Sequence, residues 1–322
     1  MSQATRTIEP VSELTPVQQR TLDTLGRTGQ PVVFDPGVVA ELRADLDEGL
    51  AELAGRLSES TSVDPPPALV VTKHDLGEVF TCEAKSAAPD DFVWSAAKAK
   101  GQVAHKAIQL SVHWRGELVP ITLVDEAIVR LADEEFGLGQ WLASLPPGDA
   151  ADLRGRAVEH VTKFLECFPP LDPRWRPVTE GASQYPLAGP IVLRARIDLT
   201  LGVPKLGESR KVIVDVKTGR LMNRHREDLR FYALIETMVR EVPPRLLASY
   251  SLDSAAAESE DVTIDLLRSA VRRTLDGVQR IVEIQFEGRP TTRTPSAACR
   301  WCACRGTCGV GQVWLAADRE SA

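Results

Sequence analysis

The alternation of apolar and polar positions divides the chain into a helical first half and a mixed second half. Five early segments carry apolar side chains at helical spacing: 11–28, 36–57, 95–112, 121–136 and 150–167. Residues 190–201 and 211–217 are β-branched and aliphatic runs around a turn, and they predict a hairpin. A helix over 224–240, a strand over 246–252 and a helix over 261–285 are expected next. This order predicts an α/β protein with a mixed β-sheet flanked by helices.

The segment TSVDPPP, residues 61–67, breaks this pattern with three prolines and predicts a stiff linker. We therefore expect a helical extension over residues 1–65 and one main domain over residues 66–322. Residues 1–65 match no motif, and a docking extension is one interpretation.

Composition and charge narrow the class of protein. The hydrophobic share of 43% and charged share of 26% are ordinary for a soluble globular chain. The chain contains no apolar run of about 20 residues that could span a membrane, and its first residues lack an apolar signal region, so we expect a cytoplasmic protein. A net charge of −7 argues weakly against a surface coated with nucleic acid but allows a local basic groove.

The nine residues VIVDVKTGR, 212–220, end a buried strand with two charged side chains. Asp215 and Lys217 lie two positions apart and so point to the same face of the strand. Pairing with the preceding strand can bring Asp198 beside them. Carboxylates and the carbonyl oxygen of Val216 form a site suited to Mg²⁺ or Mn²⁺, and the lysine can offset charge on a phosphate. A surface hairpin that ends in an ordinary Asp–Lys pair is the alternative.

RARIDLT followed by VIVDVKTGR resembles the signature of the PD-(D/E)xK nucleases, in particular the RecB-like branch that includes CRISPR adaptation exonucleases. That branch also has a G-x-x-x-H helix, matched by Gly101 and His105, and a Gln-hydrophobic-x-x-Tyr helix. Leu229 and Tyr232 match the latter, but Asp228 stands where the family has Gln.

The resemblance implies a restriction-endonuclease-like core and a Mg²⁺- or Mn²⁺-dependent deoxyribonuclease, most simply an exonuclease for single strands or DNA ends. It implies Asp198, Asp215 and Lys217 as catalytic residues, with His105, Asp198, Asp215 and the Val216 carbonyl as metal ligands. A role in DNA repair, recombination or CRISPR processing follows. Because no GxxxxGK[ST] motif is present, a helicase or adaptation partner would be a separate protein.

Basic residues follow the D-x-K strand and extend into the next predicted helix. Arg220, Arg224 and Arg226 are candidate DNA-binding residues, together with Tyr232. A solvated charged helix face is the alternative for each arginine.

Six cysteines in a cytosolic chain favour metal binding over disulfides. The resembling family binds a [4Fe–4S] cluster through one upstream cysteine and a C-x2-C-x5-C tail, which implies Cys82, Cys299, Cys302 and Cys308 as ligands that close a C-terminal clasp. Cys304 is surplus, and either it or Cys302 could be the ligand. Cys167 is interpreted as a buried small side chain. Zinc on the same thiolates, or free thiols, remain open.

Two other functions are compatible with parts of the sequence. A catalytically inactive DNA-binding or scaffold protein could keep the fold, although the intact His105, Asp198, Asp215 and Lys217 favour an enzyme. A cysteine-cluster redox regulator would account for the thiols but not for the acids of the hairpin.

Overall fold

A six-stranded mixed sheet forms the centre of the computed structural model, which describes residues 14–26, 30–61, 63, 68–89, 92–205 and 207–320. Its strands are β2 (Leu69–Thr72), β3 (Val178–Tyr185), β4 (Ile191–Leu201), β6 (Val212–Lys217), β7 (Leu246–Ser251) and β8 (Ala256–Asp261). The order is β2-β4-β6-β7-β8, and β3 pairs with the free side of β4. The pairs β2–β4 and β6–β7 are parallel, and β4–β6, β3–β4 and β7–β8 are antiparallel. The predicted mixed sheet and the predicted hairpin are both confirmed.

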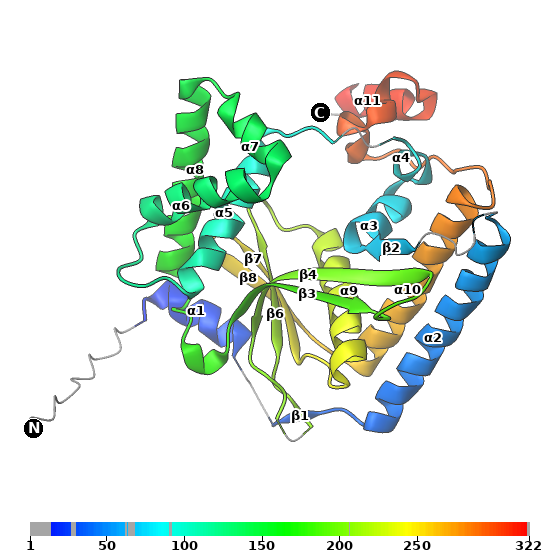
Figure 1. Ribbon diagram of the computed structural model, residues 1–322, viewed down its shortest axis with the longest axis horizontal. Coiled ribbons are helices and arrows are strands. Elements are labelled where there is room, and N and C mark those ends of the chain that lie inside the picture. Colours follow the sequence, from blue (N-terminus) through cyan, green and yellow to red (C-terminus); the bar gives the residue numbers. More distant parts are fainter. Residues whose placement is uncertain are drawn as a thin grey trace, which may run out of the picture.

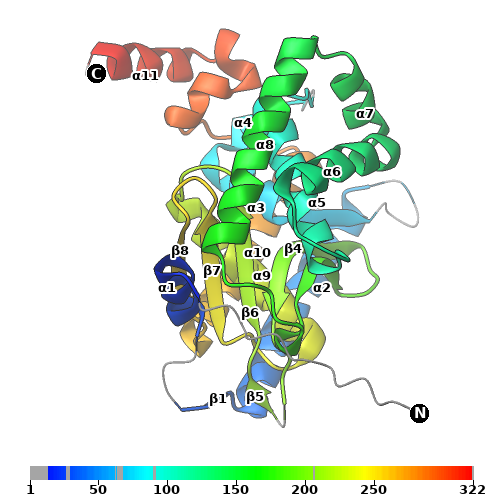
Figure 2. The ribbon, with the colours of Figure 1, turned by 90° about the vertical axis from the view of Figure 1, so that its left-hand side faces the viewer.

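Helices cover both faces of this sheet (Figures 1 and 2). One face packs against α2 (Pro36–Glu59), α3 (Lys73–Thr81), α9 (Asn223–Arg240) and α10 (Ile264–Gln285). The other face packs against α1 (Pro16–Leu25), α5 (Ala96–Val112) and α8 (Pro147–Cys167). In β6 the alternation is visible directly, because Ile213 joins the first core and Val212, Val214 and Val216 join the second.

A separate helical arm rises beside the sheet, as Figure 1 shows. It consists of α5, α6 (Pro120–Glu134), α7 (Phe136–Ala143) and α8, and it has its own apolar core. Alanines such as Ala99 and Ala107 on α5 and Ala127 on α6 are fully buried and let these helices approach closely. The arm holds α5 over one end of the sheet.

The predicted helices and strands are confirmed with small shifts at their ends. The structure also contains elements that were not predicted, among them β2, β3, β8, α7, the short β1 (Val32–Val33) and β5 (Glu208–Ser209), α4 (Glu83–Ser86) and α11 (Gly309–Glu320). β3 and β8 have polar sequences, VTEGASQY and AAESED, because both lie at the sheet's edges and expose much of their side chains. Residues 11–13 and 27–28 of the first predicted helix, and 62 and 64–67 of the predicted linker, lie outside the described residues.

Helix α2, which precedes the predicted linker, packs along α10. Its leucines Leu42, Leu46, Leu50, Leu53 and Leu57 belong to the same apolar cluster as the strands and α9. This helix therefore contributes to the main core, and the domain boundary at residue 65 stays a prediction. Among the described residues, no helix combines the length and apolar character that crossing a membrane demands.

We expect Leu46→Ala to lower the free energy of unfolding of the whole protein by about 2–5 kcal/mol, the usual cost of an emptied leucine site. Leu46 has 0% exposed surface, whereas Glu48 on the same helix is exposed, so Glu48→Ala is the matched control with little effect. Denaturant unfolding measures both. Equal stability of the two variants would show that α2 is an extension without a structural role.

Candidate functional site

The ladder between β4 and β6 ends where the predicted acids begin. Leu199 pairs with Val214, but the register does not continue to Asp198 and Asp215. Instead the Val216 N–H donates to Asp198 Oδ2 at 2.8 Å. Because the N–H and C=O of one strand residue point to the same side, the Val216 carbonyl also faces this opening. The two strands thus separate at this point, and the Asp198 carboxylate and the Val216 carbonyl face the opening between them.

Asp215 is completely buried between two lysines. Lys217 Nζ lies 2.6 Å from Asp215 Oδ2, and Lys73 Nζ lies 3.1 Å from Asp215 Oδ1. The predicted shared face of Asp215 and Lys217 is therefore seen in the structure. A buried carboxylate is costly unless it is paired, and two ammonium groups supply the pairing here.

The backbone is irregular around Asp198. Ile191 to Ile197 face the α9–α10 core at every second position, but Leu199 and Leu201 face the other core, so β4 turns at Asp198. On the partner strand β3, Glu180 has a left-handed φ of 51° and is missing from the ladder. Such distortions re-aim side chains at functional sites. Here they bring the Glu180 and Asp198 carboxylates together.

His105 completes this group from helix α5. Its Nδ1 lies 3.5 Å from Asp198 Oδ1 and 3.8 Å from Glu180 Oε1. One ligand atom from each of the three residues lies within 4.8 Å of the others, and no other such group of His, Cys, Asp or Glu is found among the described residues. One imidazole nitrogen and two carboxylates fit Mn²⁺ or Mg²⁺.

Gly101 lies one turn before His105, on the side of α5 that faces the end of β6. A Cβ at Gly101 would lie 3.4 Å from Thr218 Oγ1, which is an ordinary van der Waals contact. Gly101 therefore shows where α5 packs beside the D-x-K strand, and this approach does not itself require glycine. The helix begins with Ser95, which caps the Lys98 N–H.

Charge coupling within this site is strong. Burial works to lower the pKa of His105, but Asp198 and Glu180 raise it to about 10. Burial works to raise the pKa of Asp198, but His105 and Lys73 lower it to about 2. The ion-free site therefore holds a protonated imidazole against a carboxylate, and His105 must release that proton before Nδ1 can bind a cation.

Two residues at this site were absent from the predicted set. Glu180 lies in the polar sequence VTEGASQY, and its only signal was an acid 18 positions before Asp198 in a segment without strand periodicity. Lys73 follows Thr72, whose side chain and that of Asp75 form a capping box, so a helix start was detectable there. Neither signal indicates that the Lys73 side chain reaches Asp215 or that the Glu180 side chain reaches Asp198.

A cavity of about 720 Å³ adjoins the site between α3, α9 and α10. Lys73 and Lys217 line it, together with Arg224, Arg230 and Arg273. His225 also lines it; its Nδ1 accepts the Met222 N–H, and burial and Lys217 lower its pKa to about 4, so the neutral ring carries its proton on Nε2. Three acids, Glu78, Glu227 and Asp228, share the lining, so basic groups outnumber acidic ones.

Of the four predicted DNA-binding residues, the arginines lie in three different places and Tyr232 is buried. Arg224 lies in the cavity wall and has no ion-pair partner among the described residues, and Arg220 is exposed in the preceding loop. Arg226 points to Glu258 of β8, 3.7 Å away, outside the cavity. Tyr232 is buried, and its ring lies under the Lys73 ammonium at 4.6 Å.

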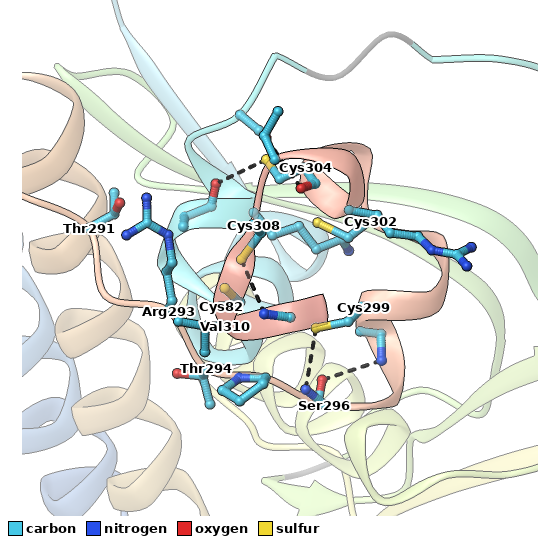
Figure 3. A pocket seen from close by; sticks show the side chains of 18 of the residues that line it. Cys82, Thr291, Arg293, Thr294, Ser296, Cys299, Cys302, Cys304, Cys308 and Val310 are labelled. Carbon is cyan, nitrogen blue, oxygen red and sulfur yellow. Dashed lines mark hydrogen bonds between the residues drawn. The ribbon is translucent and has the colours of Figure 1, made fainter. Parts of the chain in front are cut away.

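Five cysteines gather around a second cavity of about 360 Å³ (Figure 3). They are Cys82, Cys299, Cys302, Cys304 and Cys308. Cys167 lies apart at the end of α8, and it is half-buried rather than buried as predicted, because the helix ends there. Backbone N–H groups of Ser296 and Gly311 point at the sulfurs of Cys299 and Cys308, at 3.5 Å and 3.4 Å. The predicted upstream and C-terminal cysteines therefore share one cavity.

Contacts that do not involve the sulfurs also join the two chain segments on either side of this cavity. Glu83, next to Cys82, is bound by both Arg289 terminal nitrogens at 3.0 and 3.1 Å and by the Thr292 N–H at 2.9 Å. The hydrogen bond from Arg289 lowers the pKa of Glu83 to about 2. The buried Glu83 thus holds the end of α3 against the segment that leads to the C-terminal cysteines.

Comparison with known proteins identifies one matching family. The sequence model described as the PD-(D/E)XK nuclease superfamily matches residues 83–309. No curated protein matches the sequence. Two solved structures are loosely similar in fold. One is a candidate exonuclease from Eubacterium rectale, with 10% identity, a TM-score of 0.44, and coverage of 75% of this chain and 88% of that one. The other is SSO0001, with 14% identity, a TM-score of 0.32, and coverage of 80% and 94%.

We expect His105→Ala and Glu180→Gln each to weaken Mn²⁺ binding at least about tenfold while the protein stays folded, because each removes one ligand of several. Isothermal titration without DNA measures this. Glu134→Gln is the control, since Glu134 is an exposed acid that pairs with Lys106, the neighbour of His105 in sequence. Unchanged affinity in Glu180→Gln would remove Glu180 from the ligand set.

Proposed function

The chain belongs to the PD-(D/E)XK nuclease superfamily, and from that premise we propose that it is a Mg²⁺- or Mn²⁺-dependent deoxyribonuclease. The observation that carries this proposal is the position of the His105–Glu180–Asp198 group beside the Asp215–Lys217 pair. A cation-binding group and a fixed lysine on adjoining strands are the parts that phosphodiester hydrolysis requires.

The chain's own residues have separable tasks in this reaction. His105, Glu180 and Asp198 would hold the ion. Asp215 lies outside this group, paired with Lys73 and Lys217, and we keep it and the Val216 carbonyl as proposed further ligands. A divalent ion held there supplies Lewis acidity to a phosphate oxygen and lowers the pKa of bound water. Lys217, held by Asp215, stabilises the negative charge that develops on the phosphate as water attacks phosphorus and the ester oxygen leaves.

The cavity beside Lys217 supports a single-stranded substrate or a DNA end. Its volume of about 720 Å³ lies within the roughly 300–1,000 Å³ usual for small-molecule sites, so it suits a nucleotide better than a duplex. The basic groups, Arg224 above all, attract the phosphate backbone, and the His225 Nε2–H is a neutral donor. Arg230 and Arg273 pair with Glu227, so Arg224 is the arginine of this lining best placed to meet a phosphate.

We place the enzyme in the RecB-like branch, with a role in repair, recombination or CRISPR-related processing. The motif order from Gly101 to Tyr232 supports this branch, and a separate helicase or adaptation protein is the partner it suggests. A cytoplasmic location agrees with five clustered thiols that must stay reduced.

The five-cysteine cavity is proposed to hold a [4Fe–4S] cluster on Cys82, Cys299, Cys302 and Cys308. Zn–S bonds of about 2.3 Å would require sulfurs about 3.8 Å apart. No three cysteine sulfurs of the described residues form a group within 4.8 Å, which favours a larger group than a single ion. The N–H groups aimed at Cys299 and Cys308 also suit thiolates of a cluster.

Lys217→Ala tests the nuclease proposal directly. We expect the rate of Mn²⁺-dependent cleavage of single-stranded DNA to fall by about 100- to 1,000-fold, the usual effect of removing one group that stabilises the transition state. The fold should persist because Lys73 still pairs with Asp215. Gel assays measure cleavage, fluorescence anisotropy measures DNA binding, and Lys163→Ala on α8 is the control.

A Lys217→Ala variant that cleaves as fast as wild type would falsify the nuclease assignment. Tight DNA binding by wild-type protein without any metal-dependent cleavage would instead favour an inactive DNA-binding protein with this fold.

Anaerobically purified protein is expected to be brown and to contain four iron atoms per chain. Cys82→Ala should lose iron and colour, whereas Cys167→Ala should keep both, because Cys82 lines the cavity and Cys167 does not. Cys302→Ala should lose the colour and Cys304→Ala should keep it. Absorbance spectra and metal analysis measure the outcome, and a colourless preparation with one equivalent of zinc would replace the cluster by a structural zinc site.

A further inference from the structure

Lys73 reaches the active site from outside the segments that carry the family motifs. It is the first residue of α3, and the capping box of Thr72 and Asp75 fixes the helix start at this position. The Lys73 ammonium lies 3.1 Å from Asp215 Oδ1 and 3.9 Å from Asp228 Oδ2. It also lies over the Tyr232 ring.

Each oxygen of the Asp215 carboxylate therefore lies next to one lysine ammonium group. Lys73 donates a hydrogen bond to Oδ1, and Lys217 lies 2.6 Å from Oδ2 as an ion pair without hydrogen-bond geometry. The carboxylate has 0% exposed surface. In two-metal sites the ions lie about 3.5–4 Å apart and share a carboxylate. Asp215 precedes Val216, whose N–H is hydrogen-bonded to Asp198, so it is an acid that could be shared with an ion at His105, Glu180 and Asp198. A second ion on the outer side of Asp215 would meet the Lys73 ammonium.

We propose that Lys73 is a positioning residue that takes the place of a second cation at Asp215, so that the site works with a single divalent ion. This inference rests on the proposed nuclease function. It also accounts for Asp228, which stands where the resembling family has Gln, because an acid there complements a lysine held between two carboxylates and an aromatic ring. Asp215 can still ligate the single ion, since a carboxylate has about four lone-pair directions.

The number of Mn²⁺ ions bound without DNA tests the proposal. Electron paramagnetic resonance of free Mn²⁺ counts the bound ions on full-length protein whose cysteine site is loaded. We expect one ion for wild type and for Lys73→Arg, which keeps the charge. We expect two ions for Lys73→Met and Lys73→Gln, which remove the charge, and a Mn²⁺ activation curve whose Hill coefficient rises from 1 toward 2. Lys163→Met, a surface lysine paired with Glu159, is the control.

Two ions on wild-type protein, or one ion on a folded neutral variant at position 73, would overturn the role of Lys73. Two neutral variants are included so that the test does not depend on the folding of one of them, which circular dichroism measures. If neither folds, the ion counts of wild type and Lys73→Arg decide, and a second ion on either protein overturns the proposal. Wild-type protein that binds no Mn²⁺ and cleaves no DNA rejects the nuclease function itself, a result distinct from a wrong ion count.

Discussion

The constraint on which the site depends is a fully buried carboxylate, Asp215, at the end of a central strand. Such a group must be paired, and one partner, Lys217, follows two positions later on the same face. The other partner, Lys73, is the first residue of α3, which packs against β2, α9 and α10. α3 is nine residues long, or about 14 Å, and its far end leads into Cys82. The helix thus connects the active site with the cysteine cavity.

This connection suggests why the two sites occur in one domain. The buried Glu83 and the cysteines around Cys82 hold one end of α3 to the C-terminal segment, and the other end sets the position of Lys73. Because the contacts of Glu83 with Arg289 and Thr292 do not involve the sulfurs, they hold this end of α3 whether or not the cysteines carry a metal group.

The opposite side of the active site is determined by the helical arm. α5 brings His105 over the sheet because the buried alanines of α5 keep it packed against α6 and α8, with Gly101 beside Thr218. The candidate metal group therefore takes its three residues from a helix and from two neighbouring strands, whose irregular backbone at Glu180 and Asp198 brings the two acids together. Lys217 lies on a third strand, β6, so the candidate ligands and the lysine belong to different elements.

The sequence by itself determined the hairpin, the long helices and the Asp215–Lys217 pair of the site. Periodicity predicted the hairpin and the long helices, and the spacing of Asp215 and Lys217 placed them on one face, because these properties depend only on neighbouring residues. The tertiary structure decided the rest. Glu180 became a candidate ligand through a left-handed φ opposite Asp198, and Lys73 became an active-site cation through the packing of α3. Contacts between segments more than a hundred residues apart leave no periodic trace, since either partner would look the same on a solvated surface.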